Sequence, residues 1–226
     1  MSVATLSAKE QSALDLLTAD LTRVFGPRLE SIVAYGAAAL SDADDQPLHV
    51  LALVDRLGFA DLTACAPLTD RWRGAGLATP LLLSAVEFRR TLDVFPVEYG
   101  AIINSHVVVF GTNPFADCAV CDTDLRRAIE LQAKSHLIHL REGFLEAAGR
   151  PDRISRLISA SLPAYRSLLD NLDRLDPQEA DRYEPTKRLV KELAAGGSIA
   201  DPTALFERYV ADVERLWTYV DSWRLR

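Results

Sequence analysis

The apolar residues of this chain change their spacing near Asp122, and this change limits the folds that the chain can adopt. Before Asp122, short apolar runs alternate with turn-forming segments and brief helical patterns. After it, apolar residues recur at helical spacing through long stretches with few breaks. Short buried strands with helices require a sheet-based core, whereas long amphipathic helices with short connections form a bundle. The sequence therefore predicts an α+β protein with a mixed α/β domain over residues 1–117 and an all-α helical bundle over residues 118–226.

The first domain is expected to contain a small mixed sheet. Ser7 and Glu10 form a capping box that opens a helix, and Gly26 ends it. Pro67 is expected to kink a second helical stretch, over residues 59–73, or to break it into two pieces. Short apolar runs bounded by turn residues indicate buried strands. These runs cover residues 29–35, 48–54, 80–83, 94–103 and 106–110.

The second domain is expected to contain four amphipathic helices. The first covers residues 122–148 and contains no proline. The second begins at Pro151, and the third begins at Pro177 and ends at Gly196. The fourth begins at Asp201, an N-cap residue followed by a proline at the first helical position. Four such helices with short connections predict an antiparallel bundle.

Composition is typical of a globular protein of a reducing compartment. Apolar residues make up 49% of the chain and charged residues 25%. No apolar run approaches the roughly 20 residues that a membrane span needs. The first residues lack a basic segment followed by an apolar core, which argues against a signal peptide. Three cysteines do not make a secreted disulfide framework. We expect a cytoplasmic protein with no membrane partner.

The net charge of −7 is concentrated in the first domain. Up to Asp117 the chain has 8 Lys/Arg against 14 Asp/Glu, and after it 17 against 18. Binding to a nucleic-acid backbone requires a basic face, which the first domain lacks. Ion pairs on helix surfaces account for the balanced charge of the second domain. We therefore do not expect duplex nucleic acid as a partner.

Several segments in order resemble one known superfamily. A strand ending in Tyr35-Gly36, a short loop and the strand 48–54 have the layout of the nucleotidyltransferase (polymerase-β-like) superfamily. The segment 93–99 (Asp-Val-Phe-Pro-Val-Glu-Tyr), His106 and the segment 110–115 are similar to a bacterial subgroup of nucleotidyltransferase-like proteins with a helical second half. The second half opens with a pattern that this subgroup shares, formed by Leu125, Arg126, Arg127, Glu130, Leu137, Leu140 and Arg141.

The resemblance implies a site built for nucleoside triphosphates. In this superfamily the first strand ends in Gly-Ser, the second begins with Asp-x-Asp, and a later strand adds a third carboxylate. The glycine lets the backbone approach the triphosphate, the serine hydroxyl binds it, and the carboxylates hold two Mg²⁺ ions for in-line displacement.

This chain departs from the pattern at those positions. Gly36 is followed by Ala37, which lacks the hydroxyl. The Asp-x-Asp pair aligns with Pro47 and His49, or with Leu48 and Val50 after a shift of one residue. The third acid aligns near Ala101, which leaves Glu98 as the one carboxylate of the expected strand 94–103. Three upstream acids are interpreted as turn formers and could bind metal only if their loop folds back, namely Asp42, Asp44 and Asp45.

The resemblance places a ligand cleft between the two domains. The leading hypothesis is a catalytically degenerate nucleotidyltransferase-like protein that binds a nucleotide or small molecule, or regulates a partner, with no cofactor. One alternative is an active enzyme that uses Mg²⁺ to move a nucleotide onto a small molecule or protein. Another is a non-catalytic scaffold that forms a homo-oligomer or binds a protein partner. The cleft residues are Tyr35, Gly36, Ala37, His49, Glu98, Glu130, Lys134 and Arg141.

Two other motifs have simpler explanations than a functional site. Cys118 and Cys121 form a CxxC motif without a second ligand pair, so a zinc site is incomplete. His136 and His139 lie three residues apart on the first bundle helix, but no carboxylate motif accompanies them. We expect no metal at either motif.

Overall fold

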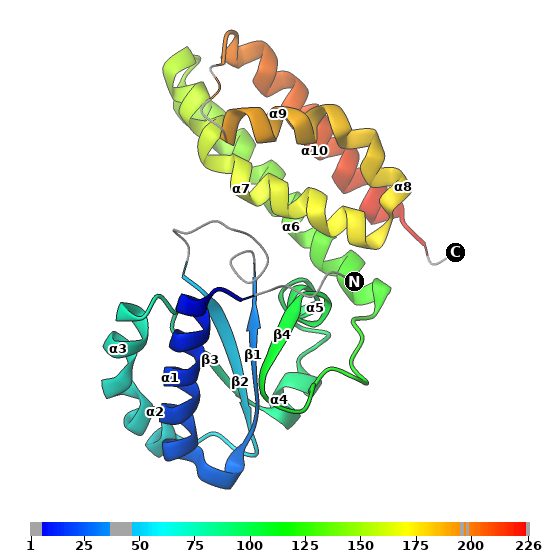
Figure 1. Cartoon of the computed structure of the whole chain (residues 1–226). Helices are drawn as coiled ribbons and strands as arrows, with labels where there is room; N and C mark the ends of the chain where they lie inside the picture. The colour runs from blue at the N-terminus through cyan, green and yellow to red at the C-terminus, as the bar shows by residue number, and fades with distance from the viewer. Residues whose placement is uncertain (1–5, 37–46, 195–196, 198, 225–226) are drawn as a thin grey trace. The chain divides into compact units, whose positions relative to one another are not determined.

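The computed structural model describes residues 6–36, 47–194, 197 and 199–224 (Figure 1). The chain divides into two compact units, Met1–Val120 and Cys121–Arg226. The first contains a small mixed sheet with helices, and the described part of the second contains helices only. The predicted α+β fold class is confirmed. No helix in the described part of the chain is long and apolar enough to cross a lipid bilayer.

A four-stranded sheet forms the centre of the first unit. The strand order is β3-β2-β1-β4. Strand β1 is antiparallel to both of its neighbours, β2 and β4, and β3 is parallel to β2. The bounds are Leu29–Tyr35 for β1, His49–Val54 for β2, Leu81–Ser84 for β3 and His106–Gly111 for β4.

Alternating side chains of β1 and β2 face two separate cores. Ile32 and Ala34 belong to the core under α1 (Ala8–Phe25), α2 (Phe59–Cys65) and α3 (Thr69–Gly74). Val33 and Leu51 belong to the core under α4 (Ala85–Arg90) and α5 (Pro96–Asn104). Figure 1 shows these two groups of helices on opposite sides of the sheet. Both faces of the central strands are buried, which explains why their sequences are almost continuously apolar.

The helices of the first unit begin and end where local sequence signals place them. The Ser7 hydroxyl accepts a hydrogen bond from the Glu10 amide at 3.3 Å, and the Glu10 carboxylate accepts one from the Ser7 amide at 2.7 Å. Gly26, with φ of +55°, follows α1. A 3₁₀ turn at Ala66–Leu68 separates α2 from α3 at Pro67, as predicted.

The predicted strand over residues 94–103 is wrong, because Pro96–Asn104 forms helix α5. Pro96 occupies the first helical position, where its fixed φ and missing amide hydrogen cost nothing. The segment is apolar on nearly every residue, and such a short run fits a buried helix as well as a buried strand. Glu98 and Ala101 therefore lie on a helix, and both are exposed.

The described part of the second unit is a bundle in which α6 packs against α7 and α10. A left-handed residue, Ala148 (φ +51°), ends α6 before α7. The predicted third helix is interrupted, because Pro185 interferes with a continuous helix and a new helix begins beside it. The bounds are Asp122–Ala147 for α6, Pro151–Leu175 for α7, Pro177–Ala180 for α8, Glu184–Ala194 for α9 and Pro202–Ser222 for α10.

A buried carboxylate joins α1 to α3. Asp20 is only 3% exposed. It accepts hydrogen bonds from the Trp72 indole at 3.0 Å, from Arg71 at 3.2 Å and from Arg23 at 2.7 Å. A buried carboxylate is tolerated only when donors replace its water. These three donors meet that requirement, and the two from α3, Arg71 and Trp72, hold it against α1.

We predict that Asp20→Ala lowers the free energy of unfolding of the first unit by about 2–4 kcal/mol, because the Trp72 indole N–H would be left buried and unpaired. Asp70→Ala is the matched control, since Asp70 also pairs with an arginine three residues later, at 2.8 Å, but is exposed. It should change stability by about 0.5 kcal/mol or less. Denaturant unfolding, followed by Trp72 fluorescence in a Trp217→Phe/Trp223→Phe background, measures both. Equal losses in the two variants would contradict this role of Asp20.

Candidate functional site

Three polar aromatic side chains line up across the sheet at the C-terminal end of β1. Tyr35 is the Cα partner of His49 on β2 and of His106 on β4. Directly paired residues of neighbouring strands project to the same face of a sheet. The three side chains therefore share the face that carries α4 and α5, since Tyr35 packs against that core. We call Tyr35, His49 and His106 the β1-edge row.

Tyr35 and His49 lie against each other at the start of the loop that leaves β1. Their ring centroids are 5.7 Å apart, with 32° between the ring planes. His49 is exposed and Tyr35 is half-buried. Burial, and secondarily Tyr99, raises the pKa of Tyr35, so its hydroxyl stays protonated and can donate a hydrogen bond. The row thus offers aromatic surface and a donor at one place.

Gly36 follows β1 and lies beside His49. Its φ of +93° lies in the region that favours glycine. A Cβ atom built at Gly36 would be 3.6 Å from Cδ2 of His49, an ordinary van der Waals distance. Backbone geometry, rather than lack of space, therefore requires glycine here.

His106 is held in one tautomer by the backbone of α5. Its Nδ1 lies 3.1 Å from the Ile102 carbonyl oxygen and 3.0 Å from that of Ile103. Carbonyl oxygens only accept hydrogen bonds, so Nδ1 carries the proton and the Nε2 of the neutral ring is an acceptor. Phe115 contacts the ring edge to face, with centroids 4.8 Å apart. His106 is the member of the row that the list of cleft residues missed, and its pairing with Tyr35 is the signal that could have identified it.

The register of β2 sets which residues at its head face outward. Leu48 and Val50 are 2% and 1% exposed, in the core under α1. Pro47 and His49 are exposed. Because side chains alternate along a strand, only the positions of Pro47 and His49 face outward at the head of β2. Neither residue supplies the carboxylate oxygens that Mg²⁺ prefers.

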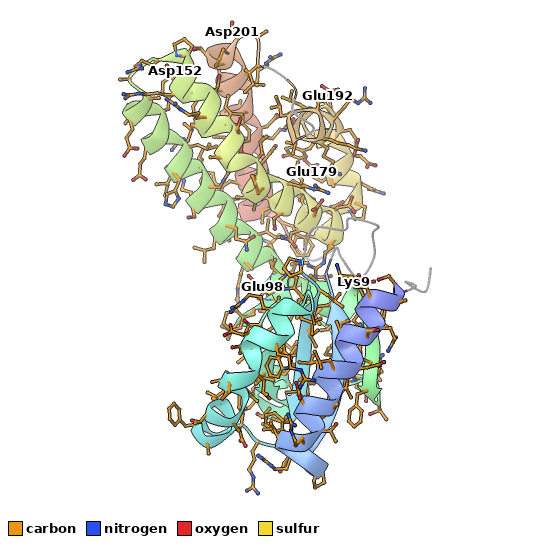
Figure 2. All side chains as sticks on the ribbon, turned by 60° about the vertical axis from the view of Figure 1, so that its left-hand side comes forward. Lys9, Glu98, Asp152, Glu179, Glu192 and Asp201 are labelled. Carbon is orange, nitrogen blue, oxygen red and sulfur yellow. The ribbon has the colours of Figure 1, made fainter. Side chains whose placement is uncertain are left out.

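The described residues contain no group of three or more His, Cys, Asp or Glu side chains that could hold a metal ion. Glu98 lies in the first turn of α5 and is exposed. Figure 2 shows it toward the end of the first unit where α1 begins, and Figure 1 shows that β1 ends there too. Ala37 and the loop acids Asp42, Asp44 and Asp45 lie outside the described residues.

The three predicted cleft residues of the bundle all lie on α6 and have partners within the bundle. Glu130 pairs with Arg126 at 2.6 Å. Lys134 places its ammonium 3.6 Å from the ring centroid of Trp217 on α10. Arg141 pairs with Glu214 on α10 at 2.5 Å. These contacts show that Lys134 and Arg141 help to hold α10 against α6.

His136 and His139 have different surroundings. Nε2 of His136 is 2.7 Å from the Tyr209 hydroxyl, and the ring stacks on Tyr165 with centroids 6.0 Å apart. Burial, and secondarily His139, lowers the pKa of His136 to about 4. His139 is exposed, and its Nδ1 forms a hydrogen bond with the Ser135 carbonyl oxygen. The contact with Tyr209 links positions 73 residues apart, so sequence spacing gave no sign of it.

The cysteines of the CxxC motif are both free. Cys118 is half-buried, and its thiol lies 3.7 Å from the Pro114 carbonyl oxygen. Cys121 is exposed and precedes α6. The motif therefore lies in the segment that connects β4 to α6.

We predict that the bundle loses stability as the pH falls from 6.5 toward 4, because His136 has its ordinary pKa of 6.5 in the unfolded chain and about 4 in the folded one. The unfolded state then binds the extra proton, so the stabilisation is present above pH 6.5 and is lost below it. His136→Gln should reduce this dependence, and the exposed neighbour variant His139→Gln should keep most of it. Urea unfolding followed by far-UV circular dichroism across this pH window tests the prediction. If the free energy of unfolding of His136→Gln depended on pH as steeply as that of the wild type, the prediction would be contradicted.

Comparisons with known proteins support the fold. No protein-family model and no curated protein matches the chain. Among solved structures, the chain is similar to spectinomycin adenyltransferase AAD(9) from Enterococcus faecialis, crystallised with ATP and spectinomycin. The TM-score is 0.50 at 9% sequence identity, and the alignment covers 92% of this chain and 98% of the other. At this identity the likeness shows the fold alone. The chain therefore has a nucleotidyltransferase-like fold, and the likeness extends over both of its units.

Proposed function

We propose that this chain is a catalytically degenerate nucleotidyltransferase-like protein that binds a nucleotide at the C-terminal end of β1 without a metal ion. The observation that carries the proposal is the head of β2, where the two outward-facing positions are Pro47 and His49. Two-metal phosphoryl transfer requires carboxylates at such positions to hold the ions. Binding without turnover suits a regulatory module.

The β1-edge row supports a nucleotide as the ligand. The exposed ring of His49, backed by Tyr35 at 5.7 Å, offers a surface on which a base can stack. The Nε2 of His106 can accept a hydrogen bond from an amino or hydroxyl group of the ligand. The neighbour of similar fold was crystallised with ATP, which makes adenine nucleotides the first ligands to test.

We predict that the protein binds ATP in excess EDTA and that His49→Ala weakens this binding about tenfold, because the exposed stacking surface is lost. His139→Ala, which removes an exposed histidine of α6, is the control and should bind like the wild type. Isothermal titration calorimetry measures both. Two outcomes would contradict the proposal. Unchanged affinity in His49→Ala would exclude this site, and absence of saturable binding of any nucleoside triphosphate would favour the partner-binding scaffold.

We also predict that acids restored at the head of β2 create a metal site. The melting temperature of the Pro47→Asp/His49→Asp variant should rise when Mg²⁺ and ATP are added. A ligand that binds only the folded state stabilises that state by about 2.7 kcal/mol at a hundred times its Kd. Pro47→Asn/His49→Asn keeps the shape without the charge and should show no such rise. Thermal melts with and without EDTA measure the difference. Equal behaviour of the two variants would mean that these positions are not those of the acid pair.

A further inference from the structure

The bundle contains a pocket that the proposed nucleotide site does not use. It has a volume of about 510 Å³ and lies between α7, α9 and α10. Binding sites for small molecules commonly span about 300–1,000 Å³ and combine apolar walls with a few polar groups. The size of this pocket is therefore that of a site for one small molecule.

The walls of the pocket are mainly apolar. Tyr209 contributes its ring, and its hydroxyl already contacts His136 at 2.7 Å and Ser161 at 3.1 Å. With that hydroxyl engaged, this wall offers apolar surface to an occupant. The other apolar side chains come from all three helices and include Ile158, Leu162, Leu189, Leu193 and Leu205.

The charged groups at the pocket favour an anion. Arg188 and Arg208 line it, both are exposed, and neither forms an ion pair with another residue in the described part of the chain. Asp212 also lines it, but its carboxylate accepts a hydrogen bond from Thr186 and another from Arg215 at 2.9 Å.

Among the described residues that line the pocket, one further acid opposes Arg188 and Arg208. Glu192 lies near the end of α9, where Figure 2 labels it, and it is exposed. Because the charge of Asp212 is compensated by Arg215, the local excess at the opening is positive. An apolar interior with a cationic opening matches a molecule that has an apolar body and one negative group.

We propose that this pocket is a binding site for an amphipathic anion, with an aliphatic body inside and a carboxylate at Arg188 and Arg208. Apolar surface transferred from water supplies most of the binding free energy, and the arginines select the charge. The site lies wholly within the helical unit. It does not depend on nucleotide binding at the β1-edge row.

Three probes of equal chain length test the charge selection. Decanoate, 1-decanol and decyltrimethylammonium are titrated into the full chain by calorimetry, each below the concentration at which it aggregates. We expect one saturable site for decanoate, about fivefold weaker binding of decanol and no saturable binding of the cation. Equal binding of all three would overturn the proposal, as would no saturable binding of decanoate.

Variants locate the site. Arg188→Gln/Arg208→Gln should weaken decanoate binding about fivefold and leave decanol binding unchanged, since each exposed charge contributes modestly. Arg166→Gln, an exposed arginine of α7 outside the pocket, is the control for charge and should bind decanoate normally. Ala211→Trp fills the opening from an exposed position and should abolish binding of both probes, with folding checked by circular dichroism. Normal decanoate binding in the double arginine variant would overturn the proposal even if Ala211→Trp failed to fold.

Discussion

The antiparallel pairing of β1 with β2 is the constraint on which the rest of the first unit depends. Both strands are buried on two faces, so each alternate residue is committed to one core or the other. A shift of one residue in this pairing would exchange the side chains that face one core with those that face the other. The outward-facing and buried positions at the head of β2 would then change places. The register that buries Leu48 and Val50 therefore also exposes Pro47 and His49.

The same pairing assembles the β1-edge row. Tyr35 is the last residue of β1, and its two neighbours in the sheet are the first residues of β2 and β4. Gly36, the residue after β1, has a positive φ and lies next to His49. The backbone of α5 fixes the tautomer of His106 at the other side of the row. Packing of the core and chemistry of the proposed site thus follow from one set of strand pairings.

Local signals in the sequence predicted most elements. Ser7 and Glu10 mark the start of α1, Pro67 marks the break after α2, and the long helical spacing after Asp122 marks α6. The segment after Phe95 was predicted as a strand because nearly all of its residues are apolar, and period alone cannot separate a buried helix from a buried strand. Contacts between distant residues, such as His136 with Tyr209 or Lys134 with Trp217, depend on how the helices pack and have no local signal.

Metal independence is the central claim, and the dependence of ATP affinity on Mg²⁺ in the wild-type protein tests it most directly. Calorimetry gives the dissociation constant for ATP in excess Mg²⁺ and in excess EDTA, and release of pyrophosphate is followed in the Mg²⁺ sample. The proposed site predicts two constants within about threefold of each other, a difference below about 1 kcal/mol, and no pyrophosphate. Binding that tightens tenfold or more with Mg²⁺, together with release of pyrophosphate, would contradict it and identify an active nucleotidyltransferase.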